Sequence, residues 1–264
     1  MYAFIDLSYY TIHRYFAVLR WYKLNEKEVG DQAEVFARFD KSFEASLRTF
    51  QKKHKFEWAN LYFARDTLRC TIWRNELFPM YKANRDVVKI SNFDPAVFDH
   101  VYDELIPKLK ATLGFGGVLY TLGAEADDVI AVAHEHLNAL NDSQPIVILT
   151  NDHDYLQLLD ENTTIVNANG EPISKKYDAQ ILKHILEYKI IRGDVSDNIP
   201  AIGKKIGEKT AYKLALDPAL LAAKLASNAD VMRQYELNTR LVSFKCIPVA
   251  IKSDIVKVLK SYLV

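Results

Sequence analysis

The sequence has few cysteines and no long apolar run, and both absences limit what the protein can be. Its two cysteines, Cys70 and Cys246, stand alone among 264 residues and lack the spacing of a metal site. Isolated cysteines favour a reducing compartment, so we expect a cytoplasmic protein. No apolar stretch approaches the ~20 residues that a membrane-spanning helix needs.

The sequence also lacks a basic segment at its start and an excess of either charge. The first residues, MYAFIDLSYY, place Asp6 inside the only apolar patch, so we do not expect a signal peptide. A hydrophobic share of 49% and a charged share of 26% are typical of a folded globular protein. The 34 basic residues balance the 34 acidic ones, whereas nucleic-acid-binding proteins usually have a basic excess. Where these charges lie therefore matters.

Short runs of β-branched and aromatic residues alternate with longer segments of helical periodicity. Helices are predicted for Gln32–Lys55, behind an Asp31 cap, and from Asp94-Pro95 onward, where Val97, Val101, Leu105 and Leu109 share a face. A turn is predicted at Asn169-Gly170. The predicted strands are Tyr2–Ile5, Asn60–Ala64, Gly117–Thr121, Ile146–Thr150 and Thr163–Asn167.

This alternation predicts an α/β fold with a central, largely parallel sheet flanked by helices. From Tyr177 onward the pattern is helical, with no convincing strand. We therefore expect an α/β domain over residues 1–177 and a helical region over residues 178–264.

Acidic residues follow four of the predicted strands. The carboxyl ends of parallel strands share one edge of a sheet, and ligands bind in the crevice there. The sequence therefore brings seven carboxylates to one rim: Asp6, Asp66, Glu125, Asp127, Asp128, Asp152 and Asp154.

Carboxylates at this density need a compensating cation, because like charges raise one another's pKa. Few basic residues lie among them, His153 and Arg65 being the nearest. Oxygen ligands without cysteine favour Mg²⁺ or Mn²⁺ over Zn²⁺. Two such ions, about 4 Å apart, could hold the attacking water and the leaving oxygen of a phosphodiester.

The acids of the stretch GAEADD also have a simpler interpretation. Acidic residues in a first helical turn complement the positive end of the helix dipole. If a metal binds there, Glu125 and Asp128 share one helical face, and Asp127 points elsewhere, toward a second ion or a water.

The segment Gly193–Leu216 supplies two more carboxylates, Asp194 and Asp197, and a group of lysines. Backbone amides at the start of a helix can hold phosphates without reading bases. The alternative is a plain helical hairpin with a solvated lysine face. The lysines concerned are Lys204, Lys205, Lys209 and Lys213.

Six motifs in order resemble those of the 5′-nuclease superfamily, which comprises flap endonucleases and 5′-3′ exonucleases. They are FID (4–6), FARDTLR (63–69), WRNELFPMYKANR (73–85), GAEADD (123–128), TNDHDYLQL (150–158) and GDVSDNIPAIGKKIGEKTA (193–211). The likeness is strongest to the short stand-alone bacteriophage type, whose compartment is the host cytoplasm. The resemblance implies a PIN-like α/β fold, a helical arch over the active site at about 78–112, and a helix-three-turn-helix motif that grips duplex DNA.

The resemblance also implies roles for particular residues. Tyr81, Lys82 and Arg85 match a segment that opens the arch over single-stranded DNA. A first metal site corresponds to Asp6, Asp66, Glu125, Asp127 and Asp128, and a second to Asp152, Asp154 and Asp197, with Asp194 nearby.

Elementary chemistry supports roles for the arch residues. Lys82 and Arg85 can stabilise the charge that develops on a scissile phosphate, and with Asp128 they are the predicted catalytic residues. Tyr81 offers a ring for base stacking. With Lys204, Lys205, Lys209 and Lys213, the arch residues form the predicted DNA-binding set.

Three positions depart from the family's pattern. Leu7 stands where glycine usually follows the first aspartate, and His153 replaces a lysine or arginine. The hairpin NIPAIGKKIGEKTA is one residue longer than usual and lacks two glycines. The resemblance implies a K⁺ ion at this hairpin, and the altered loop weakens that expectation.

The balanced net charge is consistent with a nucleic-acid partner after all. Without the nine candidate ligands, 25 acidic residues remain against 34 basic ones. The surface away from the metals is therefore basic enough to hold a phosphate backbone.

We therefore expect a structure-specific 5′-nuclease that hydrolyses DNA in the 5′→3′ direction by two-metal-ion catalysis. Its expected substrates are 5′ flaps, forks and free 5′ ends, with RNA primers on DNA as a second substrate. Mg²⁺ is the expected ion and Mn²⁺ its substitute. We expect a monomer acting in replication or repair, with protein partners that the sequence does not identify.

Three alternatives belong to other classes. One is a catalytically weak protein of the same fold that binds DNA junctions, although every expected carboxylate is present. Another is a ribonuclease of the acidic-cluster α/β type, against which the helical hairpin at Gly193–Leu216 argues. A small-molecule phosphatase is the third, and the chain shows no pocket motif for it.

Overall fold

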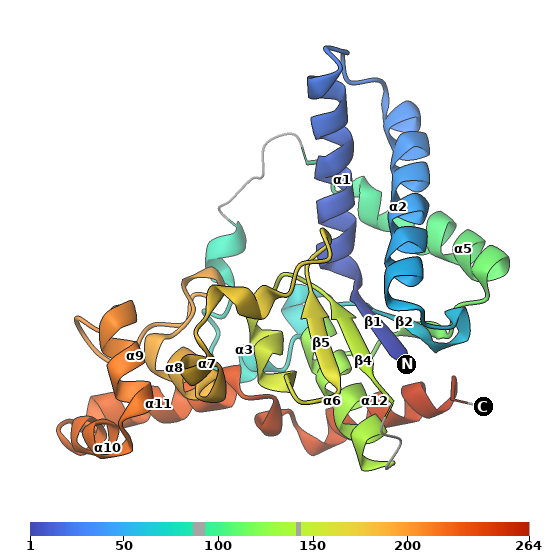
Figure 1. Cartoon of the computed structure of the whole chain (residues 1–264). Helices are drawn as coiled ribbons and strands as arrows, with labels where there is room; N and C mark the ends of the chain where they lie inside the picture. Colours follow the sequence, from blue (N-terminus) through green and yellow to red (C-terminus); the bar gives the residue numbers. More distant parts are fainter. Residues whose placement is uncertain (87–92, 141–143, 264) are drawn as a thin grey trace.

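The computed structural model of the chain describes residues 1–86, 93–140 and 144–263. Its centre is a five-stranded sheet in which all neighbouring strands are parallel, in the order β3-β2-β1-β4-β5 (Figure 1). All five predicted strands and the predicted α/β class are confirmed. The strands are β1 Tyr2–Asp6, β2 Leu61–Ala64, β3 Gly117–Leu119, β4 Ile146–Leu149 and β5 Thr163–Val166.

The register of the strands aligns their carboxyl ends. Asp6 pairs with Ala64 of β2, and Ile5 pairs with Leu149 of β4. The loops that follow β1, β2 and β4 therefore start at the same level of the sheet. This alignment places the acidic residues of those loops along one edge.

One face of the sheet is covered by α1 (Leu7–Leu24), α2 (Gln32–His54) and α5 (Ile106–Leu113). The first two project beyond the carboxyl edge as an antiparallel pair (Figure 1). Each begins at an aspartate that caps its first turn, since Asp6 accepts a hydrogen bond from the amide of Tyr9 and Asp31 from that of Glu34. The cap predicted for α2 is confirmed, whereas α1 was not predicted.

The helix predicted from Asp94-Pro95 is interrupted by a π-helical turn. It consists of α4 (Ala96–His100), the π-helical turn η4 (Val101–Leu105) and α5. The four residues predicted to share a face, Val97, Val101, Leu105 and Leu109, are all buried. These four residues stay on one buried face because the π-helical turn is a single turn within one continuous helix.

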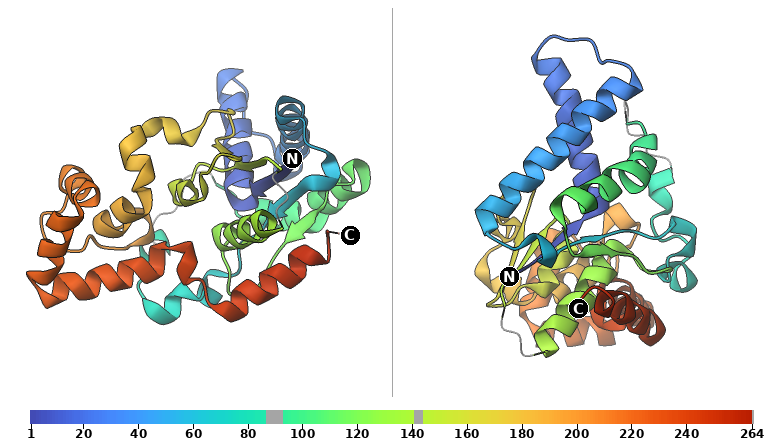
Figure 2. Two further views of the ribbon diagram at one scale, coloured as in Figure 1. Left: turned by 60° about the horizontal axis from the view of Figure 1, so that its bottom comes forward. Right: turned by 90° about the vertical axis from the view of Figure 1, so that its right-hand side faces the viewer.

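The opposite face of the sheet is covered by α6 (Ala126–Ala139) and by helices from the C-terminal third of the chain. The last helix, α12 (Val249–Lys260), returns to pack against α6 and β3 (Figure 2). The C-terminal helices thus share a core with the sheet. The boundary expected between residues 177 and 178 stays a prediction.

From Tyr177 onward the described chain is helical, as predicted, apart from an isolated bridge between Asp194 and Ile199. Residues Asn167–Gly170 form the predicted turn, in which the Gly170 amide donates to the Asn167 carbonyl. The remaining helices are α3 Arg74–Leu77, α7 Ala179–Lys183, α8 Ile185–Arg192, α9 Glu208–Leu216, α10 Pro218–Ala226 and α11 Ala229–Val242. Short turns lie at η1 Trp58–Asn60, η2 Arg69–Thr71, η3 Ala83–Asp86, η5 His153–Leu158, η6 Ile173–Lys176, η7 Val195–Asp197 and η8 Phe244–Cys246.

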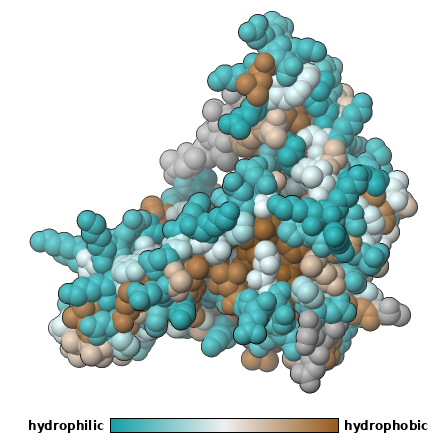
Figure 3. Space-filling model, viewed as in Figure 1, coloured by the Kyte–Doolittle hydropathy of each residue, from teal (hydrophilic) through white to brown (hydrophobic). Residues whose placement is uncertain are grey.

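The surface seen in Figure 3 is mostly hydrophilic over the upper ends of α1 and α2 and mixed over the region formed by α9 to α11. Its apolar residues gather near the centre of that face. Among the described residues, no helix combines the length and apolar character needed to cross a membrane.

The predicted arch at about 78–112 is described only in part, because residues 87–92 lie outside the described ranges. Its described ends are the turns at 78–86 and the helix that starts at α4. The arch as a whole therefore stays a prediction.

Candidate active site

A hollow of about 530 Å³ opens at the carboxyl edge of the sheet. It lies between the ends of β1, β2 and β4, the start of α6 and the loop after α8. Six of the nine predicted ligands line it: Asp6, Asp66, Glu125, Asp127, Asp152 and Asp194. The structure therefore brings together side chains that are up to 188 positions apart in the sequence.

Asp6 is held at the base of this hollow. Its Oδ1 accepts the amide of Tyr9 at 3.0 Å, and its Oδ2 lies 3.3 Å from the hydroxyl of Tyr155. Burial, and then the charge of Asp66, raises the pKa of Asp6 to about 7. A nearby cation would stabilise the charged form of a buried carboxylate whose pKa is raised in this way.

Asp66, Asp127 and Asp152 are each fixed by one backbone amide. The amide of Ala126 donates to Asp66 at 2.8 Å, and the amide of Asp128 donates to Asp127 at 2.7 Å. Asp152 accepts the amide of Asp154 at 2.8 Å. In each case a single carboxylate oxygen is used, so the other remains available to the hollow.

These three aspartates and Asp6 share a further property. Within the described residues, none of the four carboxylates forms an ion pair with a lysine, arginine or histidine. Burial, and then the charge of Asp128, raises the pKa of Asp127 well above its usual range. The four carboxylates therefore have no direct counter-charge in the described part of the chain, although Lys82, Arg85 and Lys189 line the same hollow.

Asp128 belongs to a different environment, in which Arg74 provides its counter-charge. Nη1 and Nη2 of Arg74 lie 2.8 Å from Oδ2 and Oδ1 of Asp128, and the guanidinium also contacts Glu125 at 3.0 Å. The indole of Trp73 donates to Asp128 at 2.9 Å. Arg74 is 1% exposed and Asp128 0%, so this pair is part of the protein interior.

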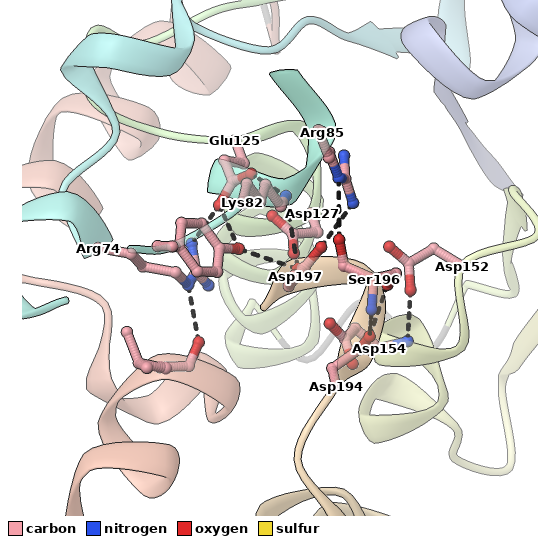
Figure 4. Close-up of polar contacts among 12 residues, drawn as sticks. Arg74, Lys82, Arg85, Glu125, Asp127, Asp152, Asp154, Asp194, Ser196 and Asp197 are labelled. Carbon is pink, nitrogen blue, oxygen red and sulfur yellow. Dashed lines mark hydrogen bonds and ion pairs between the residues drawn. The ribbon is translucent and has the colours of Figure 1, made fainter. Parts of the chain in front are cut away.

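Lys82 and Arg85 lie around Glu125 and Asp197 (Figure 4), and Tyr81 contacts the same two carboxylates. Lys82 forms an ion pair with Glu125, and Arg85 contacts Asp197 at 2.5 Å. The hydroxyl of Tyr81 lies 2.9 Å from Glu125 and 3.2 Å from Asp197. Burial opposes ionisation of Glu125, but Lys82 and Arg74 outweigh it and lower its pKa.

The backbone at Lys82 is in the left-handed region, with φ of 56°. Non-glycine residues rarely adopt this conformation, and it often occurs at functional sites. The amide of Lys82 donates to the carbonyl of Asp197 at 2.9 Å, which ties the base of the predicted arch to the loop after α8.

Another cation, Lys189 of α8, also lines the hollow. It forms an ion pair with Asp154, and its Nζ lies 3.6 Å from Asp194. Lys189 is 7% exposed. Burial acts to lower its pKa, but the nearby carboxylates outweigh burial and raise the pKa. Asp154 and Asp194 are therefore partly neutralised by the chain itself.

The orientation predicted at the start of α6 agrees with the structure, because Arg74 contacts both Glu125 and Asp128, whereas Asp127 points into the hollow. The role of Asp128 as a metal ligand and catalytic residue stays a prediction. One expectation from the sequence needs correction. Tyr81 is 4% exposed and its ring is not open to base stacking in this conformation, because its hydroxyl is drawn to buried carboxylates.

The three acids at the start of α6 remain close together. Glu125, Asp127 and Asp128 offer oxygens within 4.8 Å of one another, as a metal site would. Two of these carboxylates, however, are ion-paired with Arg74 or Lys82. Asp127 is the member of the group that faces the hollow without a cation.

The lysines predicted to bind DNA also come together. Lys204, Lys205, Lys209 and Lys213 line a groove between α9 and α10, together with Lys224. In the described parts of the chain no carboxylate pairs with any of them. The helix α9 starts at Glu208.

Arg74 and Lys189, the two buried cations of the site, were not predicted. Lys189 stands in the apolar run YKII, whereas Arg74 stands in IWRNELF, which also contains Glu76. A single charge that an apolar pattern forces into the interior needs a partner of opposite sign, and this could have identified Lys189.

The fold and site together define an α/β protein whose sheet edge carries a carboxylate-lined hollow beside a basic groove. A family model described as 5′-3′ exonuclease, N-terminal resolvase-like domain, matches residues 1–187. The chain belongs to this 5′-3′ exonuclease family.

Two curated relatives show the extent of the likeness. A 5′-3′ exonuclease of Bacillus subtilis (strain 168) is 34% identical over 154 residues, which cover 54% of this chain and 47% of the relative. A 5′-3′ exonuclease of Buchnera aphidicola (subsp. Acyrthosiphon pisum) is 30% identical over 217 residues, covering 80% of this chain and 68% of the relative. The match thus spans about half the length of the Bacillus protein.

Two solved structures share the fold over nearly the whole chain. T5 5′-exonuclease with bound zinc has a TM-score of 0.67 at 17% identity and covers 99% of this chain and 98% of its own. A complex of T5 flap endonuclease with DNA and metal ions has a TM-score of 0.63 at 16% identity and covers 98% of both chains.

Proposed function

We propose that this chain is a metal-dependent, structure-specific 5′-nuclease that hydrolyses DNA phosphodiesters in the 5′→3′ direction. The observation that carries the proposal is the group of four carboxylates, Asp6, Asp66, Asp127 and Asp152, that share one hollow without a cationic partner among the described residues. Family membership and the names of the relatives, 5′-3′ exonucleases, support the same activity.

The donor set of this hollow fits a hard divalent cation. All four groups are carboxylates, and burial together with the charge of Asp66 raises the pKa of Asp6. We propose Mg²⁺ as the ion, with Mn²⁺ as its substitute, because both prefer oxygen ligands. One ion would be held by Asp6, Asp66, Asp127 and Asp152, and the other by Asp154 and Asp194. The two ions would supply Lewis-acid activation of the phosphodiester and of water.

Lys82 and Arg85 would bind the scissile phosphate. Both line the hollow, and both are held by carboxylates at the base of the predicted arch. Their donors are therefore positioned before substrate binds, which reduces the reorganisation needed to stabilise negative charge on phosphate. Tyr81 would act by fixing Glu125 and Asp197 rather than by stacking on a base.

The groove between α9 and α10 would hold the sugar-phosphate backbone of duplex DNA. Its lysines have no carboxylate partners in the described chain, so their charges are available to phosphates. A structural neighbour, T5 flap endonuclease, was solved with DNA and metal ions, which supports DNA as the partner here. We also propose that a K⁺ ion binds at the hairpin before α9.

We propose 5′ flaps, forks and free 5′ ends as substrates, with RNA primers on DNA as a second class. The place of action would be replication or repair, by a monomer in the cytoplasm, where the two free cysteines would remain reduced. Residues 1–177 would carry most of the metal-binding carboxylates, and residues 178–264 would add Asp194 and the duplex-binding surface.

The test is cleavage of a labelled 5′-flap duplex by the purified protein, with nicked, gapped and RNA-primed duplexes in parallel. Mg²⁺ should support cutting near the flap junction and EDTA should stop it. Asp127→Asn should abolish cutting and leave the binding of the flap duplex within about threefold. Cutting that persists in EDTA, or binding without any cutting at any divalent concentration, would refute the proposal, and the second result would favour a DNA-junction-binding protein.

A further inference from the structure

Two groups of carboxylates at the hollow differ in how their charge is balanced. Asp6, Asp66, Asp127 and Asp152 line the hollow and have no ion-pair partner among the described residues. Asp194, which also lines the hollow, and Asp154, which is not part of its lining, share the ammonium of Lys189. The protein therefore supplies its own cation to one of the two groups of carboxylates.

Lys189 is not a surface residue that happens to lie near an acid. It stands on α8 between Tyr188 and Ile190, both buried, and only 7% of its own surface is exposed. An ammonium in such a place is costly unless carboxylates compensate it. The two contacts with Asp154 and Asp194 provide that compensation, and they fix the ammonium at the wall of the hollow, which Lys189 lines.

We infer that Lys189 is a built-in counter-ion that sets the affinity of the second metal position, so that the two divalent ions bind with unequal strength. This inference rests on the proposed function, since it concerns the same hollow. An ion entering beside Asp6, Asp66 and Asp127 meets unpaired carboxylates. An ion entering beside Asp154 and Asp194 has to displace, or share oxygens with, an ammonium that already neutralises them.

Two consequences follow for the positions of the ions. The first ion should bind without rearrangement of the protein. The second should bind only when the attraction of a substrate phosphate, or a high ion concentration, compensates for the displaced ammonium. Lys189 is thus a positioning residue, which acts on the reaction through the ion and not through contact with the substrate.

The experiment measures Mn²⁺ binding to the whole chain without DNA, by isothermal titration calorimetry and by counting free Mn²⁺ with electron paramagnetic resonance. The wild-type protein should bind one ion at least tenfold more tightly than the second. Lys189→Met should strengthen the second ion at least tenfold and change the first less than threefold. Lys189→Arg, which keeps the charge, should resemble the wild type.

A matched control removes a lysine from the same hollow. Lys176 lines the hollow, and its Nζ lies 3.3 Å from His153 with no carboxylate partner in the described chain. Lys176→Met should leave both Mn²⁺ affinities within twofold of the wild type. If it strengthened the second ion as much as Lys189→Met, general charge and not Lys189 would be responsible, and the inference would be wrong.

The experiment stays decisive if Lys189→Met is poorly folded. Folding that Mn²⁺ restores would support the inference, because the ion would then replace the missing ammonium. If no Mn²⁺ concentration restores folding, Lys189→Gln takes its place and must show the same tenfold gain. If the folded variant binds the second Mn²⁺ ion with unchanged or weaker affinity, the inference is wrong, whether or not the protein cuts DNA. Failure of the proposed function would appear only in the cleavage assay.

Discussion

Arg74 and Asp128 form a bidentate ion pair in the interior, with both guanidinium–carboxylate distances at 2.8 Å. The pair joins α3 to the first turn of α6, and Arg74 extends it by donating from Nε to the carbonyl of Leu241 at 2.7 Å. Asp128 therefore serves the architecture of the site, and its neighbour Asp127 faces the hollow.

Arg74→Ala should destabilise the protein strongly. Removing one partner of a buried pair leaves the other charge uncompensated, which costs about 3–5 kcal/mol. Chemical denaturation measures the loss. Arg48→Ala is the control, because Arg48 pairs with Glu44 on the surface of α2, where an exposed pair contributes about 1 kcal/mol or less. Equal losses for the two variants would contradict a structural role for Arg74.

Asp127→Asn and Asp128→Asn should separate catalysis from stability. Asp127→Asn should lower flap cleavage by at least about 100-fold, since even groups that only support metal ligands are worth 10–100-fold. It should leave the melting temperature equal or higher, because one of several like charges is removed. Asp128→Asn should lower the free energy of unfolding by about 3 kcal/mol. The assignment fails if Asp128→Asn is as stable as the wild type.

Tyr81→Phe separates a hydrogen-bonding role from base stacking. If the hydroxyl matters, the phenylalanine variant should lose about 1.5–3 kcal/mol of stability, the range for hydrogen bonds to charged groups, together with cleavage activity. The Tyr81→Leu variant should then bind DNA no more weakly than the Tyr81→Phe variant. If the ring stacks on a base, the phenylalanine variant should behave like the wild type, and only the leucine variant should lose DNA affinity.

His134 should make stability depend on pH. It is 8% exposed, and burial lowers its pKa although Asp160 lies 3.3 Å away. Below the ordinary value of about 6.5 the unfolded chain binds a proton that the native state does not, so the free energy of unfolding falls as pH decreases. Above that pH the effect is absent. Denaturation of His134→Gln between pH 5 and 8 should show a shallower slope, and an unchanged slope would assign the dependence elsewhere.

Much of the fold follows from the sequence because strands and amphipathic helices have different periods. The five strands and the capped helix α2 were predicted for that reason, since Phe39 and Phe43 recur on its buried face. Helix α1 was missed because apolar and polar residues alternate irregularly in LSYYTIHRYFAVLRWYKL. A helix wedged between a sheet and a second helix buries more than one narrow stripe.

The site was predictable in composition but not in pairing. The shared edge of a parallel sheet indicated which carboxylates meet, and the structure brings Asp6, Asp66, Asp127 and Asp152 together. Which acids are paired depends on Arg74 and Lys189, whose partners lie 54 and 35 positions away in the sequence. Periodicity carries no information about such contacts.

The most direct measurement is the position of Mn²⁺ in a crystal of the protein, located by its anomalous scattering. The account predicts an ion in the hollow with ligands drawn from Asp6, Asp66, Asp127 and Asp152, and an intact pair between Arg74 and Asp128. An ion ligated by Asp128 with Arg74 displaced, or a hollow that binds no Mn²⁺ at saturating concentration, would contradict it.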